Sequence, residues 1–143
     1  MSASRRQDER GSATLELVIV IPATLLIISA VIMAGRLALA NQAIQAVAYD
    51  TARAASVARD RAAATSDANR VAGFTLASNG LSCLSTTINV DTSGFERSAG
   101  QAATVTTTVT CTLSLGDLSL PGVPGTVTLT ADASSPIDTY RER

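Results

Sequence analysis

The sequence predicts an α+β protein with a long N-terminal helix, a short second helix and a small three-stranded antiparallel sheet. Three observations carry this prediction. Residues 17–35 form an apolar run without a charge. Residues 37–64 contain neither Pro nor Gly and are rich in Ala, Gln, Arg and Leu, which are strong helix formers. Beyond residue 80 the apolar positions recur every second residue, as is typical of strands.

The two helix-forming stretches predict one helix from about Thr14 to about Ala64. Its apolar part, residues 17–35, is about as long as a bilayer-spanning helix needs to be. Thr24 and Ser29 interrupt the run, and both hydroxyls can hydrogen-bond back to the helix. The continuation carries an apolar stripe at helical spacing, which we expect to pack on a small domain. The stripe consists of Ala43, Ile44, Val47, Ala48, Ala54, Ala55 and Ala58.

Arginines are distributed unevenly on the two sides of the apolar run. Arg5, Arg6 and Arg10 precede it, whereas Arg36 alone follows it before Arg53. This bias predicts that the N-terminus is cytoplasmic and the remainder extracytoplasmic. The expected organisation is therefore a leader over residues 1–11, a long helix over 12–64 with its span at about 17–35, and an exported domain over 65–143.

The exported part reads as a helix followed by three strands. Ser66 and Asp67 can cap the helix, Asn79-Gly80 can end it, and Val71, Phe74, Leu76 and Ala77 would form its apolar side. Alternation predicts strands over residues 86–91, 104–115 and 126–131, joined by loops over 92–101 and 116–125. Residues 136–143 read as an exposed, flexible tail.

The chain has two cysteines, Cys83 and Cys111. Cys111 is in phase with the apolar face of its strand, and Cys83 stands just before the first strand. In an exported domain two cysteines favour one disulfide, and a sheet this small would gain much of its stability from it. The alternative is a pair of buried free thiols.

Composition argues against several classes of function. A net charge of −1 gives no general electrostatic attraction for nucleic acid. Aromatic residues make up only 3%, which argues against a surface on which nucleic-acid bases could stack. Histidine is absent, which removes the usual general base and the commonest zinc ligand. We therefore expect no catalytic residue, no metal and no cofactor.

The entrance of the apolar run holds the most informative pattern, Arg10-Gly11-Ser12-Ala13-Thr14-Leu15-Glu16. A carboxylate at the edge of a membrane-spanning run is costly unless something compensates its charge. A cut between Gly11 and Ser12 would create an α-amino group that can pair with Glu16 of a neighbouring copy. Type IV prepilins show this arrangement. Two alternatives are a signal peptide cut after Ala38-Leu39-Ala40 and a plain single-pass anchor.

The segment from Arg10 to Pro22, with the Leu/Ile run around it, resembles the N-terminus of the TadE-like proteins of the tight-adherence (Tad/Flp) pilus system. Ala52-Arg53-Ala54-Ala55 resembles that family's Ala/Arg-rich helix end. The resemblance implies cleavage by a prepilin peptidase and pilus assembly, with roles for Glu16 and Pro22. It implies other pilin subunits, an inner-membrane assembly platform and the lipid bilayer as partners.

Within the Tad system the sequence favours a minor subunit. Major Flp-type pilins usually carry an aromatic residue after the Glu, where this chain has Leu17, and they are shorter than its 143 residues. Larger TadG-type members have an added domain for which this chain is too short. Other possibilities are a tethered adhesin or binding module, and a type II secretion or DNA-uptake pseudopilin. The latter usually begin with Phe after cleavage, where this chain would begin with Ser12.

Overall fold

The computed structural model describes the backbone of residues 5–98, 100–118 and 124–138. It confirms the predicted α+β class. The chain divides into two compact units, Met1–Gly35 and Arg36–Arg143, which are described one at a time. Residues 1–4 of the predicted leader, Pro121 of the predicted loop and residues 139–143 of the predicted tail lie outside the described residues.

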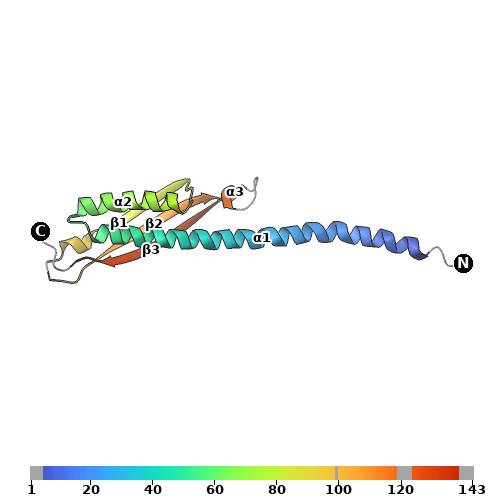
Figure 1. The fold of residues 1–143 in the computed structure, drawn as a ribbon, viewed down its shortest axis with the longest axis horizontal. Helices are drawn as coiled ribbons and strands as arrows, with labels where there is room; N and C mark the ends of the chain where they lie inside the picture. Colours follow the sequence, from blue (N-terminus) through green and yellow to red (C-terminus); the bar gives the residue numbers. More distant parts are fainter. Residues whose placement is uncertain (1–4, 99, 119–123, 139–143) are drawn as a thin grey trace. The chain divides into compact units, whose positions relative to one another are not determined.

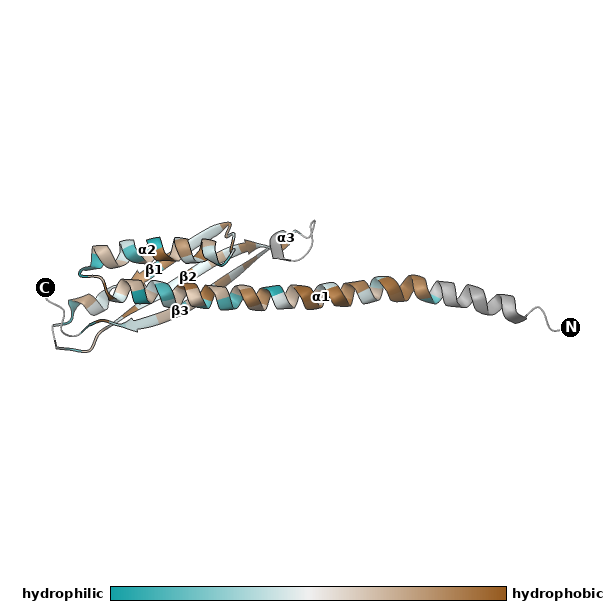
Figure 2. Ribbon diagram, in the orientation of Figure 1, coloured by the Kyte–Doolittle hydropathy of each residue, from teal (hydrophilic) through white to brown (hydrophobic). Residues whose placement is uncertain are grey.

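The first unit is the N-terminal part of helix α1 (Arg5–Ser56), seen as the blue end of the ribbon in Figure 1. Its apolar run continues through Pro22 without a break in the helix. As predicted, the Thr24 and Ser29 hydroxyls donate to the carbonyls four residues earlier, each at 2.8 Å. These bonds satisfy two polar groups inside the apolar run, which is the brown stretch of α1 in Figure 2.

The predicted continuous helix to Ala64 is wrong: α1 ends at Ser56 and α2 (Arg61–Ser78) begins after a four-residue turn. The predicted cap at Ser66-Asp67 is wrong too. Asp60 caps α2, and its carboxylate accepts the Ala63 N–H at 2.8 Å. Propensity alone could not locate the turn, because residues 57–64 contain no Pro or Gly. The turn lets α2 run back along the same sheet as α1.

The predicted end of α2 at Asn79-Gly80 is confirmed. Gly80 has a φ of +68°, the left-handed conformation that glycine adopts without a Cβ clash. Its N–H donates to the Ala77 carbonyl, and the Leu81 N–H donates to the Leu76 carbonyl, both at 3.1 Å. This is the Schellman arrangement, and it satisfies carbonyls that the end of a helix leaves open.

Strands β1 (Ser85–Asp91), β2 (Thr104–Ser114) and β3 (Thr126–Pro136) form an antiparallel sheet in the order β1-β2-β3. The third strand is five residues longer than predicted, because every residue from Thr126 to Pro136 pairs with β2. The second strand ends one residue early, and Leu115 begins a short helix, α3 (Leu115–Leu118). A 3-10 turn, η1 (Ser93–Glu96), occupies part of the predicted 92–101 loop.

Residues 36–56 of α1 and the whole of α2 pack on one face of this sheet (Figure 1). The predicted stripe of α1 is buried at most of its positions, whereas that of α2 is only partly correct. Phe74 and Ala77 are exposed, because the buried side of α2 is a row of small residues spaced by a helical turn. The buried residues of α2 are Ala64, Ala68, Ala72, Thr75 and Leu76.

The opposite face of the sheet is lined with hydroxyl groups. Three pairs bridge β2 and β3 on this face: Thr106 with Ser134 at 2.8 Å, and Thr110 with Thr130 and Thr112 with Thr128 at 3.2 Å each. Such cross-strand pairs stabilise a sheet modestly while keeping its outer face polar.

The predicted exposed tail is wrong at its first residues. Ile137 is buried in a second core cluster with Phe95 and Val105, and its N–H donates to the Ala103 carbonyl at 2.9 Å. Ile137 continues the alternation of Leu129 and Ala131, so it points to the helix-covered face. The tertiary structure thus extends the domain beyond the strand that alternation predicted.

Candidate processing and assembly segment

The predicted processing site lies within α1. Gly11 and Ser12 belong to the helix, although side chains before Glu16 lie outside the described part of the chain. Ser12 and Glu16 are four residues apart, so they share one face of the helix, separated by about one turn. A free amino group at Ser12 would therefore lie roughly 6 Å along the axis from the level of Glu16 in its own chain.

Glu16 is exposed, as are the apolar side chains that follow it. No ion pair joins it to another described side chain. The run behind it displays Leu17, Val18, Ile19, Val20, Ile21, Leu25, Leu26, Ile27, Ile28, Val31, Ile32 and Met33 at its surface. Among the described side chains, this first unit therefore presents the Glu16 carboxylate at the head of an apolar helix.

This helix is the one in the described part of the chain that is long and apolar enough to cross a membrane. None of its most apolar 18-residue window is buried inside the molecule. A core helix of a soluble protein would be mostly buried, so the exposure is consistent with a single-pass membrane protein.

Pro22 lies six residues after Glu16, inside the run. Proline has no N–H, so the carbonyl of Val18 loses its ordinary helical donor. An open carbonyl at membrane depth needs another partner or a local adjustment of the helix. Like the Glu16 carboxylate, the Val18 carbonyl opposite Pro22 therefore needs a partner that the regular helix does not supply.

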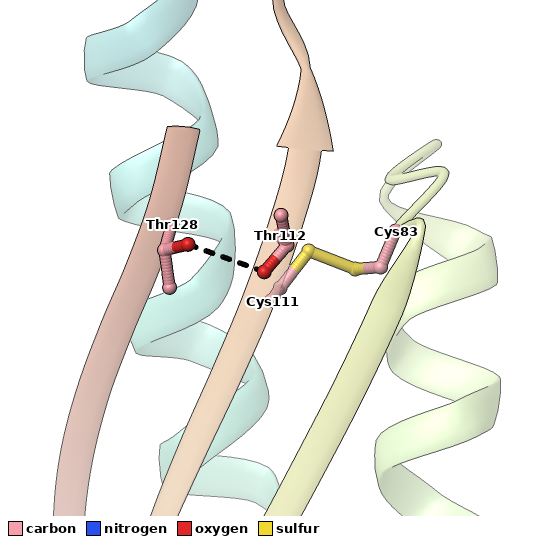
Figure 3. Close-up of a disulfide and its surroundings, with 4 residues drawn as sticks. All are labelled: Cys83, Cys111, Thr112 and Thr128. Carbon is pink, nitrogen blue, oxygen red and sulfur yellow. Dashed lines mark hydrogen bonds between the residues drawn. A yellow bond between two sulfur atoms is a disulfide. The ribbon is translucent and has the colours of Figure 1, made fainter. Parts of the chain in front are cut away.

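The two cysteines lie in the other unit and form the predicted disulfide (Figure 3). It joins the segment before β1 to the central strand β2, near the end of that strand, with 5.5 Å between the two Cα atoms. Cys111 is buried in the main core cluster, and its neighbour Thr112 points to the outer face toward Thr128. The alternative of two free thiols is wrong. Disulfides persist in oxidising compartments, which agrees with export of this domain.

Two interactions of charged side chains lie near the α1–α2 turn and η1. Arg61 pairs with Glu96 at 2.5 Å, but both side chains are more than half exposed, so the pair adds little stability. The backbone N–H and the hydroxyl of Ser93 hydrogen-bond to Asp91 and lower the pKa of that carboxyl. No group of three or more His, Cys, Asp or Glu side chains is placed to hold a metal ion among the described residues.

Alternation alone could have identified one residue that the sequence analysis passed over. Thr107 is in phase with Val105 and Val109 and is completely buried. Its hydroxyl donates to the Ala48 carbonyl of α1 at 2.9 Å, linking the central strand to the helix. The pattern of threonines on both sides of β2 concealed this inward position.

The model of the TadE-like protein family matches residues 11–53. No significant match was found among curated proteins. None was found among solved structures either. The matched segment begins at Gly11, contains Glu16, Pro22 and the apolar run, and ends within the domain-packed part of α1. Over residues 11–53 the chain is therefore similar to TadE-like proteins.

Proposed function

We propose that this chain is a minor pilin of a Tad-type pilus, processed between Gly11 and Ser12 by a prepilin peptidase. Its role is structural, without catalytic residues or a cofactor. The observation that carries the proposal is Glu16: an exposed carboxylate at the head of an exposed apolar helix, inside the family-matched segment.

The charge of Glu16 needs a partner once the helix is surrounded by lipid or by other helices. Removal of residues 1–11 supplies one, because the new α-amino group at Ser12 is positive at neutral pH. Pairing between neighbouring copies would set the axial offset of one helix against the next by about one turn. Other pilin subunits are therefore the partners that this site fits.

The proposed topology has the N-terminus in the cytoplasm and residues 36–143 outside. Two independent observations support it: the arginine bias around the apolar run, and the disulfide in the second unit. The inner-membrane assembly platform would then meet the subunit from the membrane side, and the domain would become part of a surface structure.

Processing is tested by Gly11→Leu. The variant should remain at the full precursor mass, whereas the parent should lose the mass of residues 1–11 and begin at Ser12. Gly35→Leu is the matched control: it makes the same change in the same helix, and a Cβ at Gly35 meets nothing within 4 Å. Intact mass and N-terminal sequencing of membrane-extracted protein are the measurements. A mature mass in Gly11→Leu, or a parent that keeps Met1, contradicts the proposal and favours a tethered adhesin.

Assembly is tested at Glu16. Glu16→Ala and the isosteric Glu16→Gln should be inserted and processed normally, yet be depleted from sheared filaments and from cross-linked pilin complexes. Glu16→Asp retains the charge and should recover part of the incorporation. If both neutral variants assemble as well as the parent, the carboxylate does not position neighbouring subunits.

A further inference from the structure

β3, the red strand in Figure 1, lies at an edge of the sheet. Among the described residues the strand order is β1-β2-β3, so β2 pairs with one side of β3 and no strand pairs with the other. β3 runs from Thr126 to Pro136 without a bulge, because its pairing with β2 advances by one residue at every step. An edge strand of this length and regularity presents a row of backbone groups that another strand can bind.

Two backbone hydrogen bonds show which groups of β3 point to this open side. The Leu115 N–H donates to the Gly125 carbonyl at 3.0 Å, and the Ile137 N–H donates to the Ala103 carbonyl at 2.9 Å. Both bonds continue the register of the β2–β3 ladder at its two ends. In an antiparallel pair, residues that bond to the partner strand alternate with residues whose N–H and C=O point away from it. The residues of β3 whose N–H and C=O point to the open side are therefore Thr126, Thr128, Thr130, Asp132 and Ser134.

The side chains of these residues leave the backbone edge uncovered. All of them are exposed, and the hydroxyls of Thr128, Thr130 and Ser134 bond to β2, as Figure 3 shows for Thr128. Natural edge strands are commonly protected from pairing by Lys, Pro or a bulge. β3 has no Lys or Arg, its Pro136 is its last residue, and Asp132 is its one charged residue. The open side of β3 thus lacks the usual protection along most of its length.

The sequence of β3 is complementary to itself in one antiparallel register. When two copies meet with Thr130 opposite Thr130, Thr128 lies opposite Asp132 and Thr126 lies opposite Ser134. Every open residue of one strand then faces an open residue of the other, so the N–H and C=O groups can be exchanged in pairs. The two Asp132 carboxylates are offset by four residues, about 13 Å along the strands, and do not face each other. A register centred on Asp132 would place them directly opposite, which is unfavourable.

A second β3 fits this open side better than β1, the other edge strand. β1 has seven residues and β3 has eleven, so β1 offers fewer backbone groups. Pairing of β3 with itself also places the half-buried Val127 opposite the half-buried Ala133 on the helix-covered face, so the contact covers apolar surface of both copies. One surface serves both partners, as in the twofold dimers that are commonest among homo-oligomers.

We propose that two copies of this chain associate through their β3 strands, antiparallel and centred on Thr130, to form one continuous sheet. The partner is thus a second copy, and its domain runs in the opposite direction. Subunits that follow one another in a filament have the same direction, so this contact joins copies of separate assemblies. It goes beyond the proposed pilus role and does not depend on cleavage at Gly11.

Charge at Thr130 tests the contact and its register, because this residue faces its own copy. Thr130→Lys and Thr130→Glu should each lose the dimer of the purified full chain in detergent, since like charges then lie directly opposite. An equimolar mixture of the two variants should recover it. Thr87→Lys is the matched control, an exposed threonine on the same outer face of the other edge strand, and it should dimerise like the parent. Sedimentation velocity measures the dimer fraction, and an intact Cys83–Cys111 disulfide verifies folding.

Cross-linking tests the contact directly. The two Thr130 Cα atoms should be about 5.5 Å apart in the pair, so a short bismaleimide should join two copies of Thr130→Cys and should not join two copies of Thr87→Cys. A cross-link that forms only between Thr130→Cys and Thr87→Cys overturns the proposal, because β1 is then the partner strand. A monomeric parent overturns it too, and leaves a strand of another protein as the occupant. So does a Thr130→Lys dimer as stable as that of the parent. Failure of processing in the test of Gly11→Leu would leave these results unchanged.

Discussion

Removal of the Cys83–Cys111 disulfide should severely destabilise the domain that contains it, residues 36–138. The bridge closes a loop with a sequence separation of 28 residues. In the chain-entropy description, opening a loop of this length costs about 3.6 kcal/mol of folding free energy. Small single domains are stable by only about 5–15 kcal/mol, so the loss is a large part of the total.

The packing around the bridge makes reduction a clean perturbation. Cys111 lies in the main core cluster and is fully buried, and a free thiol behaves as a small apolar group. Reduction therefore leaves the core volume nearly unchanged and acts chiefly on the unfolded chain. The variant Cys83→Ala/Cys111→Ala also removes both sulfur atoms, so it should be slightly less stable than the reduced parent.

Pulse proteolysis of the full chain in lipid nanodiscs across a urea gradient measures this effect, because protease digests the unfolded domain. With a denaturant slope of about 1 kcal/mol per M urea, the midpoint should fall by roughly 3 M or more. Ser82→Ala, beside the bridge, serves as the control and should retain the parent's midpoint. If reduced and oxidised parent unfold within about 0.5 M of each other, the loop-closure reasoning is refuted.

Three further outcomes are expected in the same assay. Thr107→Val keeps the buried volume but removes the hydroxyl that donates to the Ala48 carbonyl, so it should lower the free energy of unfolding by about 1 kcal/mol. An unchanged free energy of unfolding would show that packing alone holds the helix there. Gly94→Ala should lower the free energy of unfolding by about 1–3 kcal/mol, because a Cβ there would collide with a backbone carbonyl oxygen of β2. Gly73→Ala, where a Cβ meets open space, should raise it by up to about 1 kcal/mol, because Ala favours helix over Gly. Hydrogen bonds from Ser93 lower the pKa of Asp91 in the folded state. The contribution of Asp91 to folding stability is therefore present above pH 3.8, the ordinary pKa of the group, and is lost as the pH falls below that value. Asp91→Asn should remove this part of the acid dependence, and an unchanged pH profile would contradict it.

Local pattern was sufficient for features whose physical cause lies within a few residues. The apolar run of residues 17–35, the stop at Asn79-Gly80 and the alternation in β2 depend on side-chain periodicity and on glycine's conformational freedom. The charged residue at the head of the run, Glu16, was recognisable because an apolar context makes a charge costly.

Where local preferences are weak, tertiary packing decides. Residues 57–64 favour helix throughout, yet the chain turns there so that α2 can bury its row of alanines on the sheet. Phe74, the largest residue of the predicted side of α2, is 75% exposed, whereas most of the residues of α2 that pack on the strands are small. Because protein interiors are close-packed, each residue that meets the strands must match the space left for it.

By itself, the sequence predicted a membrane-length helix with a carboxylate at its entrance, an α+β domain, and one disulfide between Cys83 and an inward-facing Cys111. These features could be predicted because hydrophobic periodicity and the cost of burying a charge depend on residues that are close in sequence. The tertiary structure alone decided the turn after Ser56, the hydrogen bond of Thr107 to the Ala48 carbonyl of α1 and the burial of Ile137. These depend on contacts between segments far apart in sequence, which only the packed fold brings together.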